Sequence, residues 1–129
     1  MMQNEFEKLA GYKVSTETYN NIIEPMYMAS NLSKEEFIKT LNKKNFALPT
    51  KRQLINKMKK LAKEIKTSSG HVETCEIETE LYNVAKEEYA NRFGIYGVML
   101  EHEGFRFQYV TKAVFYNSKY ETVEEIKLV

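Results

Sequence analysis

The spacing of apolar residues changes once along this chain, at Gly94, and that change limits the possible folds more than any other feature. Before Gly94, apolar residues recur with the period of an amphipathic helix. After it, apolar and polar residues alternate, which is typical of half-buried strands. A helical front followed by a block of strands predicts an α+β fold, because alternating α/β units would mix the two patterns.

Four helices are expected in the first part, over residues 15–29, 33–42, 51–67 and 74–93. The second and third each begin with a capping box, Ser33 to Glu36 and Thr50 to Gln53, in which two side chains satisfy free backbone N–H groups. The third has the clearest apolar stripe, which comprises Leu54, Met58, Leu61 and Ile65.

Pro25 lies inside the first expected helix. Proline lacks a backbone N–H and clashes with the carbonyl four residues back. We therefore expect a kink or a break there, and a helix end near Asn31.

Three antiparallel strands are expected after Gly94, as a meander on which the helices pack by one face. The first covers 95–101, and Gly104 supplies the positive φ of the following turn. Residues 120–128 alternate as a third strand, although a short helix over 122–128 is the rival interpretation. We prefer the strand because a lone hairpin is only marginally stable.

The length of 129 residues suits one domain, 1–129, with a loosely ordered lead-in over 1–14, a helical part over 15–93 and the meander over 95–129. The single cysteine, Cys75, cannot form an intrachain disulfide. No apolar run is long enough for a leader or a membrane span, so we expect a cytoplasmic protein without a membrane partner.

Charge is distributed unevenly although the net charge is only +1. Residues 34–66 carry eleven Lys and Arg against three Glu, whereas residues 67–104 carry two against eight. On the third helix, basic and polar residues lie opposite the apolar stripe, and these are Arg52, Asn56, Lys59, Lys63 and Lys66.

This basic stripe has two interpretations. It could follow a phosphate backbone and bind nucleic acid. Alternatively it is a solvated lysine face, or one that faces Glu76, Glu80 and Glu87 on the next helix. The connection over 42–49 is longer than a helix-turn-helix motif uses.

Two further sets of residues are candidate sites. His71, Cys75 and Glu78 have the spacing of one helical face and could begin a metal site or a nucleophile–base pair. Without a CxxC or HExxH pattern, Cys75 is interpreted as a small buried apolar residue or a surface thiol, and we expect no catalytic residue, no metal and no cofactor. The stretch Phe105 to Tyr109 alternates aromatic with polar residues, as a base-stacking platform does, but such a face more often forms core.

The segments Val14 to Met28 and Phe46 to Lys51 resemble small orphan proteins that prophages and mobile elements of low-GC Gram-positive bacteria encode. That group has no established activity. The resemblance implies a cytosolic accessory protein and carries over no functional residue.

The function predicted from the sequence is therefore a non-enzymatic accessory or protein-interaction domain, with nucleic-acid binding through the basic stripe as the alternative. The C-terminal stretch Ile126 to Val129 is apolar with one charge, and a three-stranded meander has two unpaired edges. These features predict a homodimer formed through the C-terminal sheet.

Overall fold

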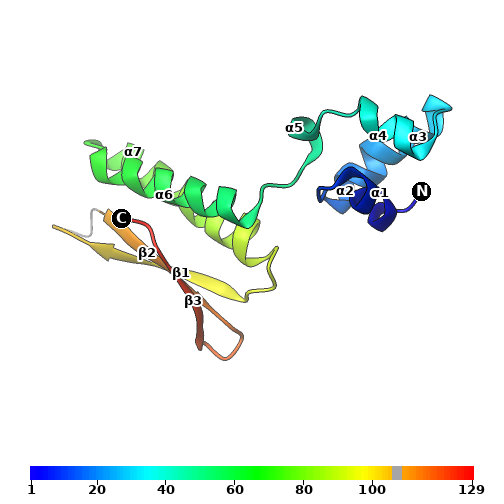
Figure 1. Ribbon diagram of the computed structural model, residues 1–129. Coiled ribbons are helices and arrows are strands. Elements are labelled where there is room, and N and C mark those ends of the chain that lie inside the picture. The colour runs from blue at the N-terminus through cyan, green and yellow to red at the C-terminus, as the bar shows by residue number, and fades with distance from the viewer. Residues whose placement is uncertain (106–108) are drawn as a thin grey trace. The chain divides into compact units, whose positions relative to one another are not determined.

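The computed structural model describes residues 1–105 and 109–129 (Figure 1). Contacts within the chain define two compact units, Met1–Leu48 and Pro49–Val129. The last helical segment ends at Ala90 and the first strand begins at Gly97, on either side of the expected change at Gly94. The second unit contains both helices and strands, because its sheet needs helices to cover one face. The expectation of a single domain stays a prediction.

The first unit is helical throughout. The expected lead-in is instead helix α1, which ends at Gly11 with a φ of 81°. It is held in place because Phe6, whose side chain is 0% exposed, packs with Val14 and Phe37 in a core that belongs to this unit. The elements are α1 (Gln3–Ala10), α2 (Thr16–Thr18), η1 (Tyr19–Ile23), α3 (Glu24–Ser30), α4 (Lys34–Thr40) and α5 (Lys43–Phe46).

The interruption expected at Pro25 takes the form of a π-helical turn directly before it. The backbone N–H of Glu24 bonds to the carbonyl of Tyr19, five residues back rather than four. Pro25 then occupies the first turn of α3, where a missing N–H costs little. The helix stops, as predicted, at Asn31, which adopts a left-handed φ of 58°.

The second unit is two helical segments on a three-stranded sheet. Both hydrogen bonds of the Thr50–Gln53 capping box are present, and α6 covers the predicted residues. The strands form one antiparallel sheet in the order β1-β2-β3, which confirms the α+β class and the meander. The elements are α6 (Lys51–Thr67), α7 (His71–Asn83), η2 (Val84–Ala90), β1 (Gly97–Glu103), β2 (Tyr109–Tyr116) and β3 (Thr122–Lys127).

The helical residues of the described chain form six continuous segments rather than the expected four. The two extra segments are α1 and α5, which lie where the sequence predicted a lead-in and a loop. No helix among the described residues could cross a bilayer, since none combines the necessary length with an apolar character.

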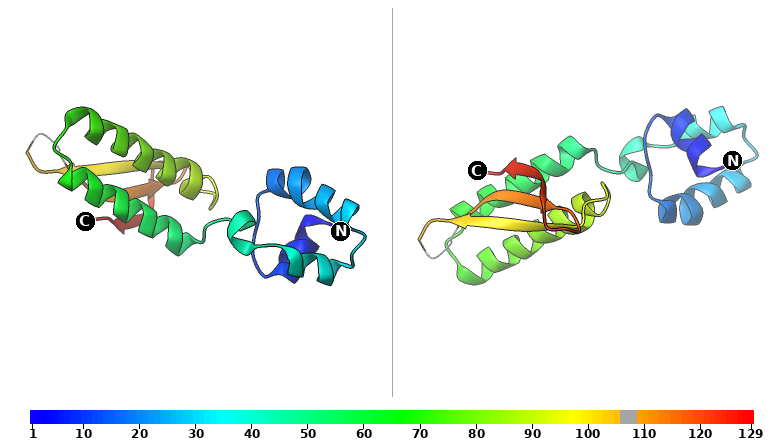
Figure 2. Two further views of the ribbon diagram at one scale, coloured as in Figure 1. Left: turned by 90° about the horizontal axis from the view of Figure 1, so that it is seen from above. Right: turned by 90° about the horizontal axis from the view of Figure 1, so that it is seen from below.

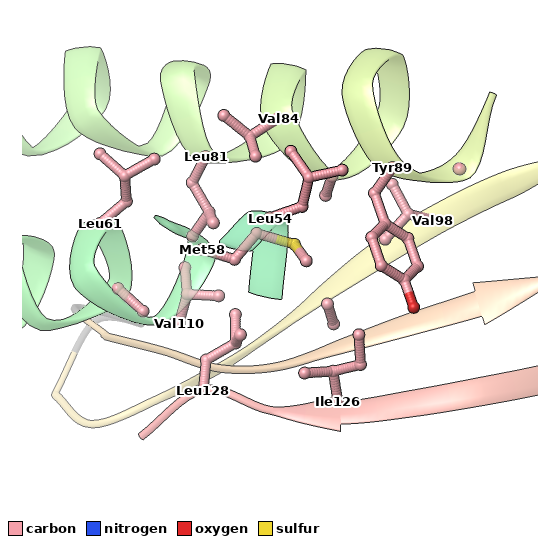
Figure 3. Packing of buried hydrophobic residues seen from close by; sticks show 14 of the residues in the cluster. Leu54, Met58, Leu61, Leu81, Val84, Tyr89, Val98, Val110, Ile126 and Leu128 are labelled. Atoms are coloured by element: carbon pink, nitrogen blue, oxygen red, sulfur yellow. The ribbon is translucent and has the colours of Figure 1, made fainter. Parts of the chain in front are cut away.

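Helices α6 and α7 lie side by side over one face of the sheet (Figures 1 and 2). The predicted stripe of α6 is buried in full: Leu54, Met58, Leu61 and Ile65 are each no more than 5% exposed. Figure 3 shows how this stripe meets Leu81 and Val84 from the other helix and the inner face of the sheet. The hydroxyl of Tyr89, at the edge of this core, donates to Oε1 of Glu124 at 2.8 Å.

A β-bulge changes which residues of β2 face the core. Glu101 pairs with Lys112 but His102 pairs with Val110, so Thr111 is the extra residue. As a result Val110 is 0% exposed in the core and lies on the same face as Ala113 and Phe115, which strict alternation along β2 would not allow. The strand interpretation of 122–128 is confirmed, and Ile126 and Leu128 fill the same core (Figure 3).

Replacing Met58 tests the core directly. Met58→Ala removes a fully buried side chain and leaves a cavity, so it should lower the free energy of unfolding by about 2–5 kcal/mol. Met28→Ala is the matched control, because Met28 is 73% exposed and its loss should change stability by less than about 0.5 kcal/mol. Urea denaturation followed by circular dichroism measures both. Equal effects of the two substitutions would contradict the packing described.

Candidate binding groove beside the edge strand

A groove runs between helix α7 and strand β1 in the second unit. On the helix side it is lined by Cys75, Glu78, Thr79 and Tyr82. Their spacing of three, four and seven residues places them on one face of α7. This face lies beside the buried stripe of the same helix, so the packing of Leu81 into the core fixes the direction in which the groove residues point. The groove has a volume of about 510 Å³.

Strand β1 supplies the other wall. Val98 and Leu100 point toward the helices and belong to the hydrophobic core or pack against it. Met99 also lines the groove but is 56% exposed. The wall is therefore apolar, and its floor is fixed by the same core that holds the sheet to the helices.

One polar contact joins the two walls. Nε2 of His102, on β1, contacts Oε1 of Glu78, on α7, and both side chains are about one-third exposed. The strand predicted to end at residue 101 continues to Glu103, so His102 lies in β1, and the turn begins at Gly104, whose φ is 95°. The contact closes the groove at one end and ties the strand to the helix.

The other residues of the candidate metal or catalytic site lie close by. His71 is the first residue of α7, and its Nε2 lies 3.8 Å from Sγ of the exposed Cys75. Both histidines and Cys75 line a second hollow, of about 920 Å³, which adjoins the N-terminal end of α7. Within residues 1–105 and 109–129, however, no three His, Cys or Glu side chains are arranged to hold a metal ion.

Strand β1 is an edge of the sheet. Across the described residues it pairs only with β2, so its other side presents unpaired backbone N–H and C=O groups. Its second half carries Glu101 and Glu103 and adjoins the bulge, features that discourage strand pairing. Its first half, over 97–100, has no charge and forms the groove wall.

The predicted nucleic-acid residues all lie on the exposed face of α6. Arg52, Lys59 and Lys63 make no ion pair in the part of the chain that the structure describes, and Lys66 lies 5.5 Å from the ring centroid of Tyr109. The helix joins acidic residues through other lysines: Lys57 pairs with Glu88 and Lys51 with Glu124, each at 3.4 Å. The stripe, which includes Asn56, is therefore a solvent-facing cationic face.

Lys51 stands apart from the stripe because it reaches the rim of the core. A hydrogen bond with the hydroxyl of Tyr89 raises the pKa of Lys51 above its ordinary value, and the charge of Glu124 adds to the effect. Burial raises the pKa of Tyr89 in turn. These three side chains fasten the start of α6 to β3.

The proposed base-stacking strand falls largely outside the described residues, which exclude 106–108. Of its aromatic members, Tyr109 is half-buried at the start of β2 and Phe105 is 75% exposed.

The stretch expected to pair two copies is used differently. Ile126 and Leu128 are buried in the chain's own core, and the N–H of Leu128 donates to the carbonyl of Thr111 at 2.9 Å. Their side chains are therefore not available to a second copy. The homodimer itself stays a prediction.

Sequence reasoning missed the groove because it treated α7 and β1 as separate elements. Thr79, Tyr82 and Met99 carry no motif, and only the fold brings them together. The charge pattern did contain a signal: the segment 67–104 combines strong acidity with the apolar stretch 98–100.

No protein-family model, curated protein or solved structure matches this chain.

Proposed function

We propose that this protein is a non-enzymatic interaction domain that receives an extended polypeptide segment along the first half of β1. The observation that carries the proposal is the combination of an open strand edge with an apolar groove beside it. Backbone hydrogen bonds to the edge supply affinity, and alternate side chains of the bound segment enter the groove and supply specificity.

The site is built from parts that do not need to move. Val98 and Leu100 are held by the core, and the His102–Glu78 contact fixes the strand against the helix. A preformed site of this kind lowers the cost of ordering on binding. Tyr82, which is 44% exposed, and Met99 are the side chains that a guest residue would cover, and both types are common at interfaces.

Filling the groove tests this function. Nonapeptides selected from a random phage-displayed library on the wild-type protein are labelled with fluorescein, and their affinity is measured by anisotropy. Thr79→Tyr places a ring in the groove and should weaken binding at least about tenfold, because a blocked pocket loses the side-chain contacts that anchor an extended segment.

Thr67→Tyr is the matched control. Thr67 is also exposed near a helix end, and its hydroxyl bonds to the carbonyl of Lys63, four residues back, as that of Thr79 bonds to Cys75. Its replacement should leave the affinity within about twofold. Selected peptides that bind both variants equally would refute the proposed site.

Self-association is the second form that an interaction domain could take, and the free edges of β1 and β3 would allow it. Light scattering at micromolar concentration measures the mass of the protein alone. A mass twice that of the 15.2 kDa chain supports a homodimer, and the mass of a single chain excludes self-association at this concentration.

Nucleic-acid binding is the second candidate function, and one specific observation favours it. Helix α6 carries seven Lys and Arg against one Glu, and three of its stripe residues face solvent without an ion pair among the described residues. Such a face attracts phosphates by a sequence-independent electrostatic term.

A mobility-shift assay tests this second function with a 30-nucleotide single strand and a duplex of equal length. If the stripe binds phosphates, affinity should fall steeply with salt, and Lys59→Glu with Lys63→Glu should abolish it. Lys8→Glu with Lys39→Glu makes the same charge change at exposed sites of the first unit and should have little effect beyond that of net charge. Absence of binding at low salt would remove the candidate.

A further inference from the structure

The two elements that form the groove are uniformly acidic. Helix α7 contains Glu73, Glu76, Glu78 and Glu80, and strand β1 contains Glu101 and Glu103. Neither element contains a lysine or an arginine. Helix α6, which packs beside α7, carries the opposite charge, so the acidity belongs to α7 and β1 and not to the unit as a whole. Of these glutamates, Glu78 lines the groove and Glu76 borders it.

Most of this charge is not neutralised by the fold. Glu101 lies 3.8 Å from Lys112 on the outer face of the sheet, and Glu78 contacts His102. The other four carboxylates make no ion pair with any residue in the ranges that the structure describes. Glu76 is exposed and lines a hollow that shares Cys75 and Thr79 with the groove. A ligand in the groove therefore lies next to the hollow that holds the unpaired carboxylate of Glu76, and charges that lie close together are only partly screened at physiological salt.

The chain's own strands are poor ligands for this site. Strand β3, the other edge, carries Glu124 and Glu125 against Lys127, and a second β1 would bring its own glutamates. Either strand would bring further glutamates close to those of α7 and β1, whereas a basic segment would bring the opposite charge. The charge of these two elements therefore favours a basic partner over a second copy.

We propose that the segment bound along β1 is basic, with lysine or arginine residues alternating with apolar ones. This inference rests on the proposed function. In an extended segment, successive side chains point to opposite sides. Apolar side chains enter the groove beside Tyr82, and the basic side chains that alternate with them lie on the outer face of the sheet, the side of Glu101 at the end of β1. Glu76 borders the groove itself. Lysine and arginine suit this geometry because their alkyl stems cover apolar surface while their charged groups stay in water.

The experiment begins from the composition of the selected peptides. A random phage-displayed nonapeptide library is selected on the full-length wild-type protein and, in parallel, on the Thr79→Tyr variant. Peptides recovered only on the wild type define the groove ligands. They should be enriched in lysine and arginine over the unselected library, and raising the salt from 50 to 500 mM should weaken their binding about tenfold or more.

Charge reversal then locates the effect. Glu76→Lys should weaken a selected basic peptide by about three- to tenfold, because it replaces an attraction by a repulsion at the groove. Glu64→Lys, on the exposed face of α6, makes the same change in net charge away from the groove and should have an effect at least threefold smaller. A scrambled peptide of identical composition controls for non-specific attraction. Circular dichroism checks that each variant is folded, and Glu76→Gln serves as a milder second variant.

The outcomes separate this inference from the function on which it rests. Groove ligands that show no excess of basic residues, and that are insensitive to Glu76→Lys and to salt, overturn the inference and leave the peptide-binding function standing. Recovery of the same peptides on the wild type and on Thr79→Tyr overturns both. Basic groove ligands that Glu76→Lys weakens, and that Glu64→Lys does not, support both.

Discussion

The second unit depends on the burial of one face of its three-stranded sheet. A sheet of this size cannot be stable with both faces in water, and the apolar stripe of α6 together with Leu81 and Val84 of α7 and η2 supplies the cover. The two helices cover one face only. On the other face Lys112 lies between Glu101 and Glu125, at 3.8 and 3.5 Å, beside the buried Val114.

The same packing creates the groove. Helix α7 uses one set of residues to cover the sheet, and the neighbouring set, Cys75 to Tyr82, then overhangs the edge strand. The bulge at Thr111 keeps Val110 and Ala113 on the inner face although they are three residues apart. His102 is directed at α7 because it continues the alternation of Val98 and Leu100 along β1, and there it meets Glu78. The core and the candidate site are products of one arrangement of residues.

Much of this fold follows from local sequence signals. The capping box at Thr50 and the stripe from Leu54 to Ile65 predict α6 to the residue, because both signals are contained within the helix itself. The change of period at Gly94 predicts the meander. Once the two turns are placed, β2 must pair with both β1 and β3, because strands joined by short turns lie next to each other.

The remainder depends on contacts that no local pattern contains. Helix α1 is stabilised because Phe6 packs against Tyr19 and belongs to the same core as Phe37, and both residues are distant in the sequence. The side on which Val110 lies depends on one extra residue in β2, and a shift of one residue reverses a strand's faces. The basic stripe of α6 was predicted residue by residue since it lies on one helix, whereas the groove requires α7 and β1 together.

The central claim is that the first half of β1 is an open edge that accepts a strand. Amide hydrogen exchange over 97–100, followed by NMR with and without a selected groove peptide, measures this most directly. In the free protein, alternate amides of this stretch should exchange fast, because every second N–H of an edge strand points away from its partner. With the peptide bound, those amides should become protected. Slow exchange of all of them in the free protein, or no added protection with saturating peptide, would contradict the account.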